Sequence, residues 1–103
     1  MIPALAHCCC SDAGHGIQGG GYGKQRLEQL EGIPIAGYLD ATDEQAADCA
    51  RKLACEEGVL AGYSTGAQLH GAIKLLQGPE RGNTIAFIAC DSGMKYFSTG
   101  LYP

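Results

Sequence analysis

The chain has few basic residues and no long apolar run. Only seven of its 103 residues are Lys or Arg, scattered along the sequence, and eleven Asp and Glu give a net charge of −4. A nucleic-acid partner is not expected, because neutralising phosphates needs a clustered excess of Lys and Arg. No apolar stretch approaches the roughly 20 residues that a membrane-spanning helix requires, and the apolar N-terminus lacks the basic start of a signal peptide. We therefore expect a cytoplasmic protein with neither a membrane nor a nucleic-acid partner.

The six cysteines include no CxxC pair, the spacing typical of structural zinc sites. Cys8, Cys9 and Cys10 are consecutive, which disfavours pairing among them because disulfide geometry is specific. Reduced thiols are predicted, some of them buried as small hydrophobic side chains. No metal site is expected; the alternative is a site built from His7 and the cysteine triplet.

Length and composition fit one folded domain at most. The chain is 46% hydrophobic and 17% charged, a balance that argues against disorder. Residues 1–14 have no clear periodicity and are expected to form an irregular leading segment. Residues 15–103 are expected to form the folded part, without internal repeats.

Short apolar runs alternate with amphipathic segments. Helices are predicted over about 43–57, which opens on a capping-box pattern at Thr42, and over about 66–77. Strands are predicted over about 35–39 and 84–90. The second of these, TIAFIAC, is a continuous apolar run typical of a strand buried on both faces of a parallel sheet. This order predicts an α/β fold in three layers, with the sheet between helices.

Ligands in such sheets bind where the chain leaves the carboxyl ends of the strands. The turn at Ser64 and the loop at Asp91 meet this condition, and the glycine-rich loop over 15–23 is a third candidate wall. Ser64 lies at the start of a predicted helix, where a hydroxyl either donates a hydrogen bond to a ligand or simply caps the helix. Both roles remain open on the residues alone.

Two familiar catalytic motifs are incomplete. The sequence GYSTG around Ser64 matches the nucleophile elbow of α/β-hydrolases, which requires an acid and then a histidine further along the chain. All three histidines precede Asp91, the candidate acid, so the hydrolase triad is excluded. The glycine-rich loop before Lys24 is not a Walker A motif, because Gln18 replaces the first glycine and Gln25 the Ser or Thr.

Four segments occur in an order and spacing known from one enzyme family. The sequences are HGIQGGG at 15–21, EEGVLAG at 56–62, STGA at 64–67 and DSGMKYFST at 91–99. They resemble the H-K-I-Q-G-x-G loop, the E-E-G-I-L-x-G segment, the S-S-G-A turn and the D-S-G-E-R-Y-L-S-T ending of the cysteine synthase and cystathionine β-synthase family. The chain is thus similar to the C-terminal part of these enzymes, which use pyridoxal 5′-phosphate (PLP) and have fold type II.

This resemblance implies roles for several residues. Ser64 corresponds to the serine that hydrogen-bonds the pyridine nitrogen of PLP, and Gly62 and Thr65 flank it in the cofactor site. The family's glycine loop lines the mouth of the active site, which implies substrate-loop residues Gln18, Gly19 and Gly21. The complete enzyme is expected to be a homodimer that performs β-replacement or β-elimination on a β-substituted amino acid in cysteine biosynthesis.

The chain also departs from the family pattern. None of its four lysines falls at the motif of the lysine that holds PLP, so no catalytic residue is assigned and no covalent attachment of PLP is expected. Cys90 stands where the family usually has proline. The alternative interpretation is therefore a catalytically inactive, truncated remnant or an association module.

Overall fold

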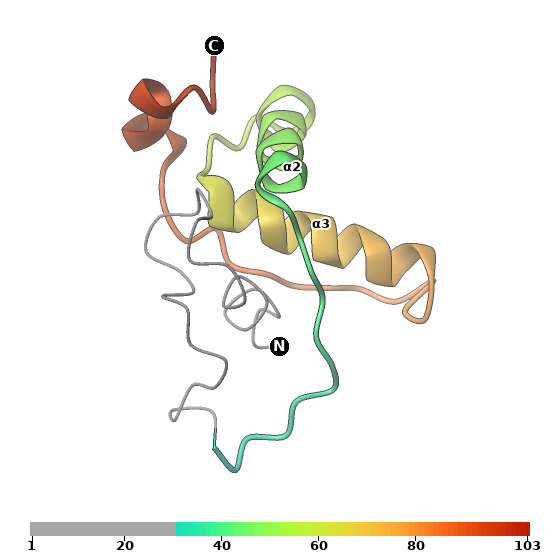
Figure 1. Ribbon diagram of the computed structural model, residues 1–103. Helices are drawn as coiled ribbons and strands as arrows, with labels where there is room; N and C mark the ends of the chain where they lie inside the picture. The colour runs from blue at the N-terminus through green and yellow to red at the C-terminus, as the bar shows by residue number, and fades with distance from the viewer. Residues whose placement is uncertain (1–30) are drawn as a thin grey trace.

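The computed structural model describes residues 31–103, whose regular structure is helical (Figure 1). Helix α2 spans Asp43–Glu57, helix α3 spans Tyr63–Gln77, and a 3-10 helix, η2, spans Gly93–Thr99. None of the described helices is long and apolar enough to cross a membrane. The predictions for the leading segment and the glycine-rich loop lie outside the described residues.

Helix α2 has the bounds that the sequence predicts. The Thr42 hydroxyl accepts a hydrogen bond from the Gln45 backbone N–H at 3.2 Å, and the Gln45 side chain accepts one from the Thr42 N–H at 3.0 Å. This reciprocal capping box satisfies two of the N–H groups that every helix start leaves without a partner. Gly58 ends the helix in the left-handed conformation, with φ of 70°, and its N–H returns to the Ala54 carbonyl.

Helix α3 begins three residues earlier than predicted. The predicted start at residue 66 leaves Ser64 and Thr65 in a turn, whereas the Gly66 N–H already bonds to the Gly62 carbonyl at 3.2 Å. Gly62 is therefore the N-cap, and it has no side chain with which to cap the helix. The predicted end at Gln77 is confirmed.

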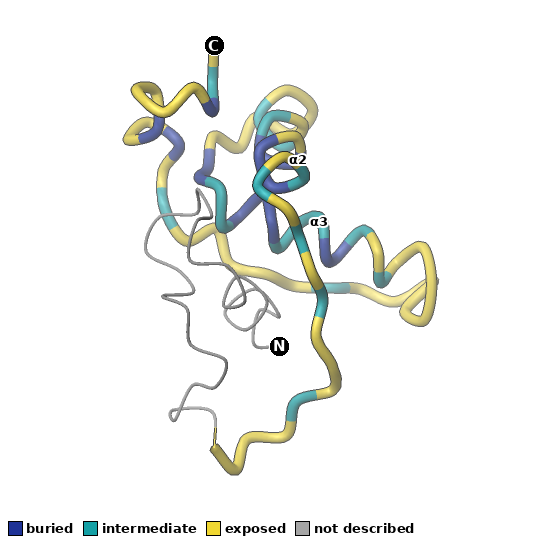
Figure 2. Tube along the Cα trace, in the orientation of Figure 1, coloured by how far each residue is buried: buried dark blue, intermediate teal, exposed yellow. Residues whose placement is uncertain are grey.

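Small residues let α2 cross the N-terminal half of α3 closely. Ala46 and Ala67 are both buried and in contact. A methyl group built on Gly66 would collide with the Ala46 carbonyl oxygen and would lie 2.9 Å from the Ala50 side chain. Figure 2 shows that the buried residues gather at this crossing.

A second cluster attaches the C-terminal segment to α2. Tyr96 and Leu101 are buried against Ala47 and Ala50. The Arg51 side chain ties the end of the chain down by donating to the Leu101 carbonyl at 2.7 Å. The C-terminal residues therefore form part of the same core as the helices.

The predicted strands are not found among the described residues. Residues 35–39 and 84–90 run as drawn-out segments without helical turns (Figure 1). Neither segment pairs in a sheet, and the described residues contain one isolated antiparallel bridge, between Ala61 and Ser92. Burial on both faces of the 84–90 segment is also wrong, since the side chain of Ile88 is 72% exposed. An extended segment becomes a strand only when a neighbouring strand takes up its backbone groups. Here α3 provides partners for part of this segment instead.

Candidate functional site

The N-terminus of α3 and the loop at Asp91, which the sequence analysis named as two candidate ligand-binding loops, lie against each other. The Ala61–Ser92 bridge joins the two segments, and the Gly93 N–H donates to the Leu60 carbonyl at 3.0 Å. The Tyr102 hydroxyl donates to the Ala61 carbonyl at 2.5 Å. The C-terminal segment thus holds the residues that lead into α3.

Ser64 is the second residue of α3 and is half-buried. Since Gly62 is the N-cap, the simple capping role for Ser64 is wrong. Its carbonyl accepts a bond from the Gln68 side chain at 3.3 Å, but its hydroxyl has no hydrogen-bond partner among residues 31–103. The hydroxyl therefore remains able to donate to a bound group at the positive end of a helix.

The two residues that flank Ser64 in the predicted cofactor site have packing roles. Thr65 is fully buried, and its hydroxyl accepts a hydrogen bond from the Cys90 backbone N–H at 3.2 Å. Gly62 is buried, and a methyl group on it would collide with Asp91 Oδ1 and the Tyr96 ring. A glycine at this position lets the Asp91 loop close onto the helix. Contact of either residue with a cofactor stays a prediction.

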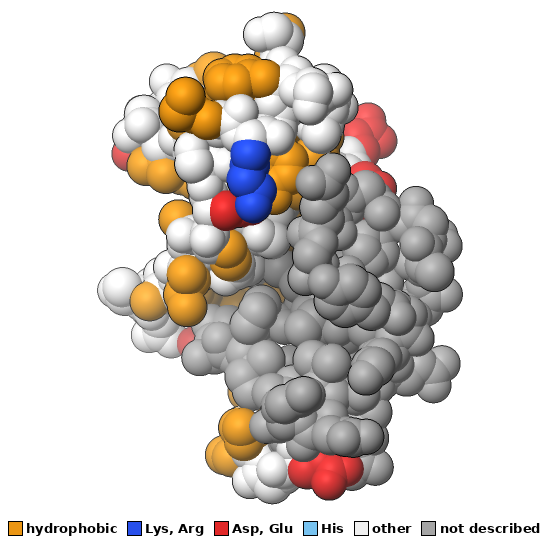
Figure 3. All heavy atoms as spheres, turned by 90° about the vertical axis from the view of Figure 1, so that its left-hand side faces the viewer, with side chains coloured by type: hydrophobic (Ala, Val, Ile, Leu, Met, Phe, Trp, Pro, Cys, Tyr) orange, Lys and Arg blue, Asp and Glu red, His pale blue; other side chains and the backbone are white. Residues whose placement is uncertain are grey.

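Asp91 organises the loop through two neighbours that the sequence analysis did not single out. Its Oδ2 accepts a hydrogen bond from the Tyr96 hydroxyl at 2.5 Å and forms an ion pair with Lys95 Nζ at 3.1 Å. Burial, together with the hydrogen bond to Asp91 and its charge, raises the pKa of Tyr96 to about 12. The available signal was their closeness in the sequence, since Lys95 and Tyr96 follow Asp91 by four and five residues. Figure 3 shows that apolar side chains also gather on this side of the molecule.

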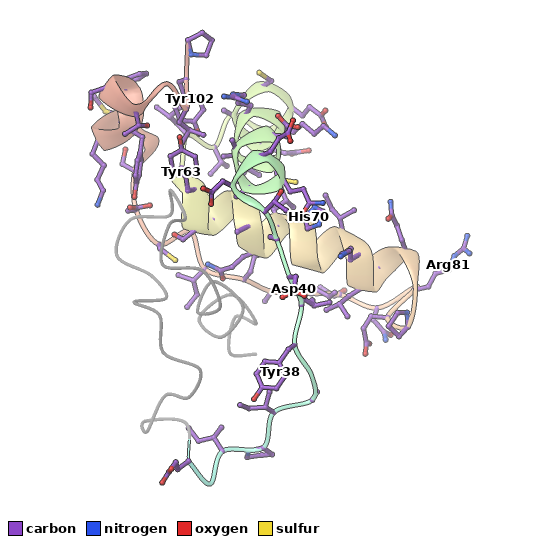
Figure 4. The ribbon with its side chains drawn as sticks, viewed as in Figure 1. Tyr38, Asp40, Tyr63, His70, Arg81 and Tyr102 are labelled. Atoms are coloured by element: carbon purple, nitrogen blue, oxygen red, sulfur yellow. The ribbon has the colours of Figure 1, made fainter. Side chains whose placement is uncertain are left out.

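Tyr63 completes the contact between α3 and η2. Its ring meets that of Tyr96 edge-on, with the centroids 5.5 Å apart. Tyr63 and Tyr102 both pack against the cluster that joins α2 to the C-terminal segment (Figure 4). Edge-to-face aromatic pairs stabilise a contact beyond the area that they bury. The first turn of α3 is therefore packed against η2 on one side.

Gln68 is a further residue that the sequence analysis missed. Its side-chain amide hydrogen-bonds both the N–H and the carbonyl of Ile88, at 3.3 and 3.1 Å. The same nitrogen lies 3.2 Å from Cys90 Sγ. A single glutamine gave no signal in the sequence, since its partners are 20 and 22 residues away.

No metal-binding cluster is present in the described part of the chain. The alternative site at His7 and the cysteine triplet lies outside residues 31–103, as do Gln18, Gly19 and Gly21. Of the described lysines, Lys95 pairs with Asp91. The described residues therefore supply a hydroxyl donor at a helix end, and the absence of covalent PLP attachment stays a prediction.

No family model matches the sequence, but individual proteins do. The chain is 32% identical over 95 residues to a cysteine synthase of Staphylococcus aureus, which covers 84% of the chain and 31% of that protein. It is 30% identical to a cysteine synthase of Helicobacter pylori over 110 residues, covering 98% of the chain and 36% of that protein. The chain thus spans about a third of the length of these relatives.

A solved structure has a similar fold. It is the crystal structure of a lysine-to-alanine mutant of O-ureido-L-serine synthase with O-ureido-L-serine bound, which is 28% identical in sequence and superposes with a TM-score of 0.74. The superposition covers 91% of the chain and 30% of that enzyme. The overall path of the chain is therefore shared with the corresponding part of a larger enzyme.

Proposed function

Because the chain belongs to the cysteine synthase family, over about a third of the length of its relatives, we propose that it supplies the wall of a PLP site that faces the pyridine nitrogen. In this proposal it is the C-terminal part of a cytoplasmic, homodimeric enzyme. The reaction is β-replacement or β-elimination on a β-substituted amino acid, leading to cysteine. The α/β sheet predicted for the complete fold belongs to the same proposal.

The hydroxyl of Ser64, which has no hydrogen-bond partner among residues 31–103, carries this proposal. It lies in the first turn of α3, where the first backbone N–H groups of the helix point outward and make the surroundings positive. A hydroxyl there can donate to a neutral pyridine nitrogen, whereas a carboxylate would favour protonation of the ring. PLP, when bound, acts as an electron sink, and a neutral ring is a weaker sink that suits β-replacement over transamination.

The remaining residues of the turn suit the same task. Thr65 is occupied by the Cys90 N–H and so keeps the start of α3 fixed. The Asp91 carboxylate is held in place by its contacts with Tyr96 and Lys95. These contacts orient Ser64 while leaving its own hydroxyl available to the cofactor.

A second candidate function is a non-catalytic remnant or association module. Both candidates share one feature: none of the four lysines of this chain falls at the family's attachment motif. In-frame coding sequence upstream of Met1 with that lysine motif would support the enzyme, and its absence would support the remnant. A second measurement is to mix the chain with PLP, reduce any imine with borohydride and map the labelled lysines. We expect sparse labelling spread over exposed lysines. A stoichiometric adduct at one lysine would contradict the expectation of no covalent attachment.

Substitution of Ser64 tests the proposed site, and the assay uses the complete enzyme of which this chain is the C-terminal part. Ser64→Ala removes one neutral hydrogen bond, so PLP affinity should fall about two- to tenfold in an absorbance titration. Ser64→Asp should alter the absorption spectrum of bound PLP and the distribution of products, because its carboxylate favours a protonated ring. Ser98→Ala, an exposed serine in η2, is the matched control and should leave both unchanged. An Asp variant with the wild-type spectrum and products would refute the role of Ser64.

A further inference from the structure

The side chain of Gln68 occupies the place that a neighbouring strand would take beside Ile88. Its Oε1 accepts a hydrogen bond from the Ile88 N–H at 3.3 Å, and its Nε2 donates to the Ile88 carbonyl at 3.1 Å. A side-chain amide has one carbonyl and an NH₂ group, so it can match both backbone groups of one extended residue. This pairing fixes the register between the 84–90 segment and α3.

Two further contacts extend the attachment to the first turn of α3. Gln68 Nε2 also lies 3.3 Å from the Ser64 carbonyl and 3.2 Å from Cys90 Sγ. The Cys90 N–H donates to the buried Thr65 hydroxyl at 3.2 Å. In an extended segment, residues two apart direct their backbone groups to the same side. Ile88 and Cys90 are therefore both anchored to the turn that contains Ser64.

Asp91 follows Cys90 directly. It packs against the N-cap Gly62 and accepts a hydrogen bond from the Tyr96 hydroxyl. A shift of the 88–90 segment along α3 would move Asp91 relative to the start of the helix. Gln68 contacts both the 88–90 segment and the Ser64 carbonyl, so it sets the position of one relative to the other.

We propose that Gln68 is a positioning residue that holds the 88–90 segment and the Asp91 loop in register with Ser64. This inference rests on the proposed function only for its consequence, the orientation of the Ser64 hydroxyl toward a cofactor. Gln68 itself lies one helical turn from Ser64, and its amide is engaged by Ile88, Cys90 and the Ser64 carbonyl.

Amide hydrogen exchange and NMR chemical shifts of the full 103-residue chain test the proposal. Gln68→Met keeps the length of the side chain and a high helix propensity but removes every hydrogen bond. Exchange at the Ile88 N–H should become about three- to tenfold faster, as expected for one lost hydrogen bond. The Ser64 amide resonance should shift, whereas exchange in the middle of α2 should not change. Gln77→Met, at the exposed end of α3, is the matched control.

A second variant covers the case in which Gln68→Met does not fold. Gln68→Lys retains a donor for the Ile88 carbonyl but has no acceptor for the Ile88 N–H, so it should also speed exchange there. Exchange rates and a Ser64 shift equal to those of Gln77→Met would overturn the proposal, as would faster exchange spread evenly over α2 and α3, which indicates a merely structural role. The PLP titration of the Ser64 variants in the complete enzyme separates the two proposals: a Ser64→Asp variant with the wild-type spectrum and products would count against the proposed function, while the exchange result would still decide the role of Gln68.

Discussion

Replacing Gly66 by alanine should separate the two helices at their closest approach. A Cβ atom at this position would overlap the Ala46 carbonyl oxygen and lie 2.8 Å from the Ala50 backbone nitrogen. Both obstacles are backbone atoms of α2, so no side-chain rotation can relieve them and the whole helix must move. Overpacking of this kind costs about 1–3 kcal/mol, offset by the gain of about 1 kcal/mol from placing alanine instead of glycine in a helix. With the obstacle in the backbone we expect a net loss of about 2 kcal/mol.

Gly71 provides a matched control in the same helix. A Cβ atom there would lie 3.2 Å from Leu39 Cδ1, the end of a flexible side chain, and would otherwise gain the same helix propensity. Gly71→Ala should therefore leave the free energy of unfolding unchanged or raise it by up to about 1 kcal/mol. The two variants share the same chemical change and differ only in what the new methyl group meets.

Thermal and urea unfolding monitored by circular dichroism measure both variants. For a domain of this size, 1 kcal/mol corresponds to roughly 4–8 °C in Tm, so Gly66→Ala should melt about 8–16 °C below the wild type. Gly71→Ala should melt at or above the wild-type temperature. Equal Tm values for the two variants would refute the inference that a close helix crossing at Gly66 holds the fold together.

Two further perturbations test the cap of α2 and the Asp91 loop. Thr42→Ala removes one half of the capping box and should lower the free energy of unfolding by about 0.5–2 kcal/mol in urea melts; an unchanged midpoint would contradict the hydrogen bond from Gln45. The pKa of Tyr96 is raised from 10.0 to about 12 by burial and by Asp91. Its contribution to stability should therefore be complete below about pH 10 and be lost as the pH rises toward 12. Tyr96→Phe should flatten this alkaline fall, and an identical pH profile in that variant would exclude Tyr96 as its source.

Sequence reasoning succeeded where the signals are local. The bounds of α2 follow from the capping box at Thr42 and from Gly58, which are neighbours of the helix in sequence, and both ends are confirmed. The start of α3 was placed three residues late because Ser64 and Thr65 are common capping residues. The Thr65 hydroxyl accepts a hydrogen bond from the Cys90 N–H instead. The Ser64 hydroxyl has no hydrogen-bond partner among residues 31–103, and the N-cap is Gly62, which has no capping side chain. The Ser64 turn and the Asp91 loop were chosen as ends of strands; they lie together in the fold, although the described residues form no strands there.

The strand predictions failed for a reason that the sequence alone could not reveal. The run at 84–90 is apolar throughout, which is the pattern of a segment covered on both faces. In the described residues Ile88 is 72% exposed, and its backbone groups bond to Gln68 instead of a strand. The apolar composition of a segment indicates that it is suited to burial. Strand pairing requires in addition a second segment beside it. The relatives are about three times as long as this chain, so we expect an apolar run of this kind to find its sheet only alongside such additional chain. This explains the proposed role of Gln68. Its side-chain hydrogen bonds keep the 84–90 segment extended and in register with Ser64, and they do not depend on a neighbouring strand.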